Sequence, residues 1–251
     1  MTMKLNINDR AALAIKNGSK KVEIRANKKD SGKDYGTLKT NDIIEFNSNN
    51  LDVFYVKVKE VNYYNSLEEL FTMEGTRYTT SSTNDYNEAI NNVNKLDGYK
   101  EAIRKNGVYA IHIEYLYSVN TVWEELIEKA NKVRNKREVS SMVSAGQVSA
   151  TILTKDHNIY TGVCIDTASS LGMCAERNAI ANMITNGENE IIKLVCIDSK
   201  GNVGYPCGIC REYLMQLSKS SKDIEILKNI ETHEIIKLEE LIPNWWGYDR
   251  L

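Results

Sequence analysis

Hydrophobic and polar positions follow different patterns in the two halves of the chain. In the first half, short apolar or alternating runs are separated by turn residues, as is typical of β-strands. A short helix ending at Gly18 precedes these runs, and a polar loop with a surface helix interrupts them. The expected helix covers residues 11–17, the loop with its helix 77–94, and the strands 20–25, 42–47, 53–61 and 107–117. This order predicts a small β-barrel with helices.

In the second half, apolar residues recur at helical spacing on either side of a short apolar run. The first helix starts near Ala175 and ends at the stop signal Asn186-Gly187. Residues 191–197, IIKLVCI, predict a buried strand, and a second helix is expected after Pro206. This helix–strand–helix order predicts a layered α/β domain.

The two patterns meet at a short polar joint. Strand-like VYAIHIEYLY gives way to helix-like TVWEELIEKANKV, and Ser118 and Asn120 lie between them. Composition changes as well, because all five cysteines and both prolines follow residue 160. We therefore expect two domains, covering residues 1–118 and 121–251.

Charge and hydropathy exclude some classes of function. The chain has 32 Lys and Arg against 34 Asp and Glu, so a net charge of −2 gives no overall signature of nucleic-acid binding. The first ten residues lack an apolar core, and no apolar run approaches the roughly 18 residues of a membrane span. Neither a signal peptide nor a membrane segment is expected. Reduced, metal-binding thiols fit the cytoplasm.

Candidate chemistry is concentrated in two short motifs, CAE at 174–176 and PCGIC at 206–210. A catalytic zinc takes three protein ligands and leaves the fourth position for water, and Cys174, Cys207 and Cys210 supply three thiolates. A structural zinc has no use for a carboxylate two residues from a ligand, whereas a hydrolytic site needs one to carry a proton. We predict a catalytic zinc site with these ligands and with Glu176 as the catalytic residue.

Two alternatives to a catalytic zinc site stay open at this point. Cys164 or Cys196 would close a four-ligand structural site, although both lie in apolar runs where cysteine is commonly a small buried hydrophobe. The C-x-x-C pair alone would also fit a redox dithiol.

The local surroundings of the predicted ligands favour thiolates. Each metal-binding segment opens a predicted helix, whose dipole stabilises an anion at that end. Arg177 can donate hydrogen bonds to sulfur and offset the negative charge of three thiolates. Its alternative is an exposed ion pair on the surface.

Residues from about Thr121 onward resemble the cytidine deaminase family, in its small, three-cysteine, usually tetrameric branch. The matching stretches are VSATILTKDHNIYTG, LGMCAERNAI and PCGICREYLMQL, while the ending LEELIPNWWGYD is closer to blasticidin S deaminases. The resemblance implies a three-layer α/β fold with a mixed sheet, zinc at the three cysteines and Glu176 as proton shuttle. It also implies a homo-oligomer, either a tetramer or a dimer.

The residues of this chain differ from those of the family at positions that bind the substrate. Cytidine deaminases carry an Asn and a Glu that hold the ribose hydroxyls, and Cys164 and Asp166 stand at those positions here. Asp166 can accept a hydrogen bond from a hydroxyl group, although its side chain is shorter than that of the Glu it replaces. The Cys164 thiol is only a weak hydrogen-bond donor. We take both as candidate substrate-binding residues. Trp245 and Trp246 either pack the last helix or reach a neighbouring subunit's pocket.

The first half resembles the ASCH family, a PUA-like barrel, through GSKKVEIR, LKTNDIIEF, NSLEEL and NGVYAIHIEYL. Such domains are often taken to bind RNA, and one branch resembles N4-acetylcytidine amidohydrolase, which uses a Lys, a Thr and a Glu. Lys20 takes the position of that Lys, but Glu23 stands where the branch has Thr. We expect a nucleoside or nucleotide pocket lined by Lys20, Glu23 and Arg25, with a carboxylate from Glu68, Glu69 or Glu74. The alternative is a solvated, charged strand edge.

Together these observations predict zinc-dependent hydrolytic deamination of a cytosine-type nucleoside or analogue. Cytidine and deoxycytidine are the default substrates, and a modified or larger aminated pyrimidine is the other possibility. The first domain would bind or process a nucleoside for salvage. The alternatives are an RNA-binding module that tethers the deaminase, and a non-catalytic interaction protein stabilised by zinc.

Overall fold

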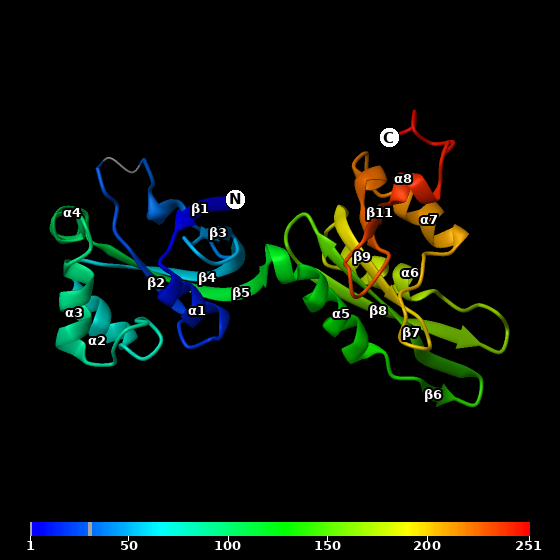
Figure 1. The fold of residues 1–251 in the computed structure, drawn as a ribbon, viewed down its shortest axis with the longest axis horizontal. Coiled ribbons are helices and arrows are strands. Elements are labelled where there is room, and N and C mark those ends of the chain that lie inside the picture. Colours follow the sequence, from blue (N-terminus) through cyan, green and yellow to red (C-terminus); the bar gives the residue numbers. More distant parts are fainter. Residues whose placement is uncertain (1, 30–31) are drawn as a thin grey trace. The chain divides into compact units, whose positions relative to one another are not determined.

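The computed structural model describes residues 2–29 and 32–251 and divides into two compact units, Met1–Asn120 and Thr121–Leu251 (Figure 1). The expected architecture of a helix-decorated β domain followed by a layered α/β domain is confirmed. No helix in the described part of the chain is long and apolar enough to span a bilayer.

Five strands build the sheet of the first unit, in the order β1-β3-β4-β5-β2. They are β1 (Thr2–Asn6), β2 (Val22–Arg25), β3 (Ile43–Asn47), β4 (Phe54–Tyr64) and β5 (Val108–Ser118). Only β1 and β3 are parallel. The two end strands approach each other, because Arg25 Nη2 of β2 donates to the carbonyl oxygen of Asn6 in β1 at 2.8 Å. This bridge brings the edges of the sheet together, as the expected barrel requires.

Four helices cover this sheet: α1 (Asp9–Lys16), α2 (Leu67–Glu74), α3 (Tyr86–Asn94) and α4 (Tyr99–Asn106). Figure 1 shows α2, α3 and α4 gathered at one end of β4 and β5. Their apolar faces share a core with β2 that includes Val22, Leu70 and Phe71. Helix α1 begins two residues before the expected start, because the Asn8 side chain caps it by accepting a hydrogen bond from Ala11 N at 2.9 Å.

The second unit is a mixed sheet with helices on both faces. Its strands run in the order β11-β10-β9-β7-β6, and β8 also pairs with β7. Only β9 and β10 are parallel. The strands are β6 (Arg137–Ser140), β7 (Val143–Thr154), β8 (Ile159–Thr167), β9 (Ile191–Ile197), β10 (Glu225–Leu227) and β11 (Ile235–Lys237). The helices are α5 (Val122–Val133), α6 (Ala175–Thr185), α7 (Gly208–Met215) and α8 (Leu238–Leu241).

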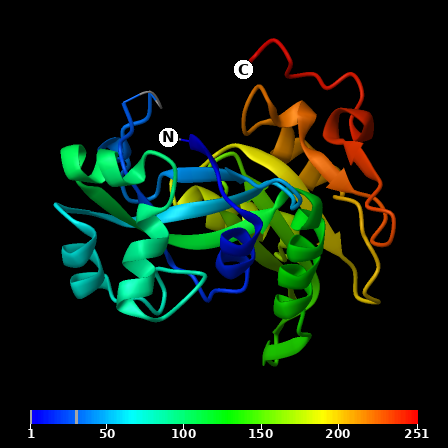
Figure 2. The ribbon, with the colours of Figure 1, turned by 60° about the vertical axis from the view of Figure 1, so that its left-hand side comes forward.

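Helices α5 and α6 lie on opposite faces of this sheet (Figures 1 and 2). The face under α6 presents Ala150 and Ile152 of β7, which share a core with Ala179 and Ile180. The expected three layers are therefore present. Three short 3₁₀ turns, Tyr35–Thr37, Val119–Thr121 and Ser221–Asp223, complete the chain.

Gly162 in β8 lets α6 approach the sheet at backbone distance. A Cβ atom at this position would collide with the backbone nitrogen of Ala179 and with the carbonyl oxygen of Ala175. Both atoms belong to helix backbone, so neither can swing aside as a side chain would. The absence of a side chain at Gly162 therefore fixes how the start of α6 sits on the sheet.

We expect Gly162→Ala to destabilise the protein by about 3 kcal/mol, the upper end of overpacking costs, because α6 must move as a unit. Gly204→Ala is the matched control, since the nearest atoms to its Cβ lie at 4.0 Å and the backbone is unstrained. The free energies of unfolding from chemical denaturation would be compared. Equal stabilities of the two variants would contradict this role for Gly162.

Candidate functional site

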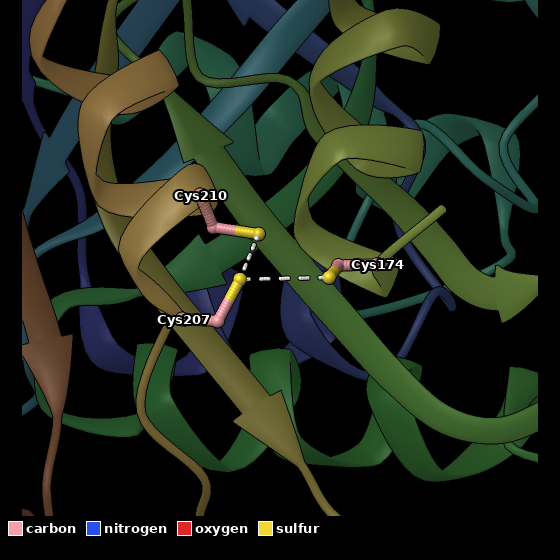
Figure 3. Close-up of side chains that lie close together, drawn as sticks. All are labelled: Cys174, Cys207 and Cys210. Atoms are coloured by element: carbon pink, nitrogen blue, oxygen red, sulfur yellow. Dashed lines mark hydrogen bonds between the residues drawn. The ribbon is translucent and has the colours of Figure 1, made fainter. Parts of the chain in front are cut away.

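The three cysteines singled out in the sequence meet at the ends of two helices (Figure 3). Cys174 immediately precedes α6, Cys207 immediately precedes α7, and Cys210 lies in the first turn of α7. The Sγ atoms of Cys174 and Cys207 are 3.6 Å apart, and those of Cys207 and Cys210 are 3.5 Å apart. All three sulfur atoms lie within 4.8 Å of one another.

This arrangement can hold a metal ion. A tetrahedral ion with metal–sulfur distances near 2.3 Å separates its sulfur ligands by about 3.8 Å, close to the spacing seen here. Thiolates are soft ligands that suit zinc. It is the only group of three or more metal-ligand side chains in the described residues, and neither Cys164 nor Cys196 belongs to it. A closed site with a fourth cysteine is therefore not what the structure forms.

The pKa values of the three thiols are shifted in different directions by their surroundings. Burial acts to raise the pKa of Cys207, but hydrogen bonds from the backbone of Cys210 and Ile209 and from the neighbouring thiols lower it below its ordinary value. Burial raises the pKa of Cys210, and the nearby charge of Glu176 adds to the effect. Burial and the Cys207 thiol raise the pKa of Cys174. Of the three, the exposed Cys207 is thus the most easily ionised.

Glu176 is buried beside the cysteine cluster, with 5% of its surface exposed. It lies in the first turn of α6, two residues after Cys174. Burial raises the pKa of Cys196 well above its ordinary value, and the charge of the Glu176 carboxylate and a hydrogen bond to it raise it further. The sequence suggests a buried hydrophobe or a fourth metal ligand at Cys196, but not its contact with Glu176, because that contact joins β9 to α6.

The Arg177 guanidinium lies against the cysteine cluster. Partial burial acts to lower the pKa of Arg177, but a hydrogen bond to Cys174 and the charges of the three thiols raise it. Its Nη2 also lies 3.4 Å from the carbonyl oxygen of Gly172, in the segment that leads to Cys174. The guanidinium therefore ties this segment to the cluster.

Cys164 and Asp166 lie on β8 alongside the segment that carries the first cysteine. Backbone bonds pair Ile165 with Met173, which places Cys174 level with Cys164 in the register. A Cβ atom at Gly172 would lie 3.4 Å from Asp166 Cα. The structure thus brings both candidate substrate residues next to the approach to Cys174.

The two side chains on β8 differ in exposure. Cys164 is buried, and its Sγ lies 3.2 Å from Val148 N and 3.7 Å from Asp166 Oδ2. Asp166 is exposed. Of the pair, Asp166 is therefore the side chain that can meet a ligand, whereas the Cys164 thiol is engaged by its own neighbours.

The two tryptophans near the C-terminus have different surroundings. Trp245 belongs to the core of the second unit, with 5% of its surface exposed, whereas Trp246 is 60% exposed. Both indole nitrogens donate to the carboxylate of Glu212 in α7, at 2.8 Å from Trp245 and 3.1 Å from Trp246. Trp245 is therefore a packing residue, and Trp246 is the one available at the surface.

The first unit contains a cavity of about 330 Å³ lined by Lys20, Glu23 and Arg25. Only 6% of the surface of Lys20 and of Glu23 is exposed, so the interpretation as a solvated strand edge is wrong. Glu23 Oε2 lies 3.3 Å from Lys20 Nζ, and Glu23 Oε1 lies 2.8 Å from Arg25 Nη2. The expected pocket residues are therefore brought together as a buried charge cluster.

The carboxylate expected from α2 is not among the described residues that line this cavity. Glu74 instead accepts hydrogen bonds from Tyr64 at 2.7 Å and from Asn62 at 3.0 Å, and it lies 2.9 Å from His112 Nε2. The cavity contains Thr79 in its place, whose carbonyl oxygen accepts a hydrogen bond from Lys20. No local signal marks this contact, because it joins residues 59 positions apart.

Comparisons with known proteins match the two units separately. A family model described as the ASCH domain matches residues 5–116, and the cytidine and deoxycytidylate deaminase zinc-binding region matches residues 121–224. The cytidine deaminase of Mycoplasma genitalium is 30% identical over 97 residues, which are 38% of this chain and 75% of that protein. The cytidine deaminase of Sporosarcina psychrophila is 31% identical over 130 residues, 51% of this chain and 93% of that protein.

A crystal structure of the cytidine deaminase from Mycobacterium tuberculosis also matches, with 26% identity and a TM-score of 0.43. The match covers 50% of this chain and 98% of that one. The two family-model matches confirm the ASCH and cytidine deaminase resemblances seen in the sequence. Through the region that begins at Thr121, the chain belongs to the cytidine deaminase family, and it carries an ASCH domain ahead of that region.

Proposed function

We propose that the chain catalyses zinc-dependent hydrolytic deamination of a cytosine-type nucleoside or analogue, with Cys174, Cys207 and Cys210 as zinc ligands. The observation that carries this proposal is the convergence of three thiols within 4.8 Å beside the buried carboxylate of Glu176. A redox dithiol or a structural zinc would not require that carboxylate. The relatives named as cytidine deaminases support the same reaction.

The residues of this chain have distinct parts in the reaction. Bound zinc would supply Lewis acidity, which lets a water molecule lose a proton near neutral pH. Glu176 accepts that proton and delivers it to the ring nitrogen beside the aminated carbon. The oxygen of the deprotonated water bonds to the aminated carbon, and Glu176 then passes the proton of that new hydroxyl group to the amine. The C–N bond breaks, ammonia leaves, and the carbon becomes a carbonyl.

Arg177 and Cys196 position the groups that react. Arg177 lowers the negative charge that three thiolates impose, through its hydrogen bond to Cys174. Cys196, on β9, donates a hydrogen bond from its thiol to the Glu176 carboxylate. Both contacts hold the carboxylate and the first ligand in place while the substrate reacts.

Cytidine and deoxycytidine are the default substrates, and Asp166 is the residue that we expect to hold a sugar hydroxyl. Its exposed carboxylate lies beside the segment that leads to Cys174. The shorter Asp166 arm and the engaged Cys164 thiol leave room for a modified or larger aminated pyrimidine. In the first unit, the cavity with Lys20, Glu23 and Arg25 is proposed to bind a nucleoside.

We further propose that the enzyme works in the cytoplasm as a homotetramer or homodimer, and that residues 1–118 and 121–251 form separate domains. Reduced thiol ligands require a reducing compartment. In this arrangement the nucleoside-binding unit and the deaminase unit serve pyrimidine salvage in one chain. RNA tethering would need an exposed basic face, and Lys20 cannot contribute to one because it is buried.

In metal-free protein, Cys207 should react fastest with a thiol alkylating agent near pH 8. It is exposed and its pKa is lowered, whereas Cys210 and Cys196 are buried and their pKa values are raised. Zinc should protect Cys207 from the reagent. Mass spectrometry of labelled peptides would measure both effects, and unprotected Cys207 in zinc-loaded protein would argue against its role as a ligand.

Glu176→Gln should lower the deamination rate by about 10²–10⁴-fold, the usual contribution of a positioned acid–base group, while the zinc content is retained. Glu128→Gln is the matched control, because Glu128 is an exposed carboxylate on α5, on the opposite face of the sheet from α6. Ammonia release and metal content would be measured for both. Full activity of Glu176→Gln would rule out the proton-shuttle role.

Asp166→Ala should raise KM for cytidine about tenfold or more with little change in zinc content, since a hydrogen bond to a charged group is lost. Asp166→Glu keeps the carboxylate and should retain most of the affinity. Steady-state kinetics on the two variants would separate these cases. An unchanged KM in Asp166→Ala would show that this carboxylate does not hold the sugar.

A further inference from the structure

The cavity of the first unit is lined by a cluster of buried charges, Lys20, Glu23 and Arg25, which we call its floor. Deamination in the second unit does not explain this cluster. The cavity volume of about 330 Å³ is within the range of small-molecule sites. Lys20 and Glu23 are almost completely buried, and the Arg25 side chain is 13% exposed. Buried charges are costly unless they serve pairing or binding, so this floor needs a physical reason.

The floor carries more positive than negative charge. Glu23 is the single anion, and it contacts Lys20 at 3.3 Å and Arg25 at 2.8 Å. Burial acts to raise the pKa of Glu23, but Arg25 and Lys20 lower it, so the carboxylate is ionised. Burial lowers the pKa of Lys20, although the charge of Glu23 opposes this shift. When Lys20 and Arg25 are both charged, one positive charge remains without a protein counter-charge among these three groups.

Lys20 can attract a ligand through its charge, but its ammonium protons are already hydrogen-bonded within the protein. Its Nζ donates to the carbonyl oxygens of Val22 and Thr79, and it also contacts Glu23. Three acceptors match the three protons of an ammonium group, which supports the charged form. Arg25 is held in a similar way, because Nε and Nη2 donate to Glu23 and Nη2 also reaches Asn6. The two cations are therefore fixed before any ligand enters.

The other charged residues that line the cavity also carry more positive than negative charge. Arg10 and Lys28 line the cavity together with one further anion, Asp97, which lies 3.7 Å from Lys28. Four cationic and two anionic side chains thus line the cavity, an excess of two positive charges. One wall consists of four consecutive hydroxyl residues, Thr79, Thr80, Ser81 and Ser82.

The apolar and aromatic residues that line the cavity can pack against a planar ring of a ligand. Ile7, Ala89 and Val93 contribute apolar surface, and the Tyr99 ring lies beside them. Burial raises the pKa of Tyr99 to about 12, so its hydroxyl stays protonated as a donor. A ligand with a planar apolar body and an anionic end would match both kinds of wall.

We propose that this cavity binds a phosphorylated nucleoside, with a terminal phosphate directed to the Lys20–Glu23–Arg25 floor. The proposal rests on the nucleoside-binding role given above to the first unit, and it names the class of ligand. A phosphate monoester carries about −1.5 to −2 charges at pH 7, which matches the excess of the lining. Lys20 and Glu23 are only 6% exposed, so a terminal phosphate, which is free on three sides, fits beside them more easily than a phosphate inside a chain. An internal phosphodiester of RNA carries one charge and is flanked on both sides.

Titration calorimetry of the full-length, zinc-loaded Glu176→Gln protein, in which deamination is slowed, tests the class of ligand. The ligands are cytidine, cytidine 5′-monophosphate and a ten-nucleotide RNA without terminal phosphates. The monophosphate should bind at least about tenfold more tightly than cytidine, because the excess positive charge of the cavity lining attracts its phosphate. Equal binding of nucleoside and monophosphate would overturn the proposal. Tighter binding of the RNA would overturn it in favour of an RNA surface.

Two charge reversals locate the binding site, because the deaminase unit offers the monophosphate a second place to bind. Arg10→Glu places a negative charge in the cavity wall and should remove the preference for the monophosphate. Arg104→Glu makes the same change on α4, outside the cavity, and should preserve that preference. Arg10 is exposed, so its replacement leaves the buried floor intact. Equal effects of the two variants would place the phosphate elsewhere and overturn the proposal.

Cytidine deamination by the wild-type protein is assayed in parallel, so that the two proposals can fail separately. Deamination without a preference for the monophosphate would defeat only the ligand class assigned to the cavity. A preference that depends on Arg10 in a protein that deaminates nothing would support the cavity and defeat the proposed reaction.

Discussion

The contact between α6 and the bare backbone at Gly162 is the constraint on which the candidate metal site depends. It sets the height of α6 above the sheet, and Cys174 and Glu176 lie at the end of that helix. The other two thiols come from α7, which follows the adjacent strand β9. Because β7 pairs with both β8 and β9, the two helix starts lie on neighbouring parts of one sheet. The geometry of the thiols is therefore a consequence of sheet order and of one close approach.

Both units gather ionisable groups in a cluster that is at least partly buried, and the two clusters are of opposite sign. In the deaminase unit, three thiols lie beside the buried carboxylate of Glu176, and in the proposed zinc-loaded form the cation and Arg177 would offset the negative charge of the thiolates. In the ASCH unit, Lys20 and Arg25 surround a single carboxylate. Each cluster is costly to bury by itself, and each is consistent with binding a partner of the opposite charge. This common feature connects the two binding proposals without requiring any particular placement of the two units.

The sequence predicts the chemistry of the site better than the contacts around it. Cys174, Glu176, Cys207 and Cys210 are recognisable because ligand type and short spacing are local properties of the chain. The strand β1 is missed, although Met3 and Leu5 alternate with polar residues, because its pairing with β3 lies some forty residues away. Such pairings depend on the whole sheet, which a local pattern does not encode.

The same limit explains what is missed in the ASCH unit. The sequence predicts a pocket lined by Lys20, Glu23 and Arg25, but the carboxylate expected from α2 does not line the cavity, and the burial of the three residues comes from the tertiary structure. Thr79 reaches Lys20 from a polar loop that carries no distinctive motif. The contact of Cys196 with Glu176 is similar, since a cysteine in an apolar run gives no sign of a polar neighbour. Residue type thus identifies reactive groups, whereas long-range packing decides which neighbours tune them.

X-ray absorption spectroscopy of the zinc-loaded, full-length chain tests the central claim most directly, because it counts the ligands of the metal. An open site built from Cys174, Cys207 and Cys210 predicts about three sulfur atoms near 2.3 Å and one oxygen or nitrogen near 2.0 Å. Four sulfur ligands would show a closed structural site and would contradict the account.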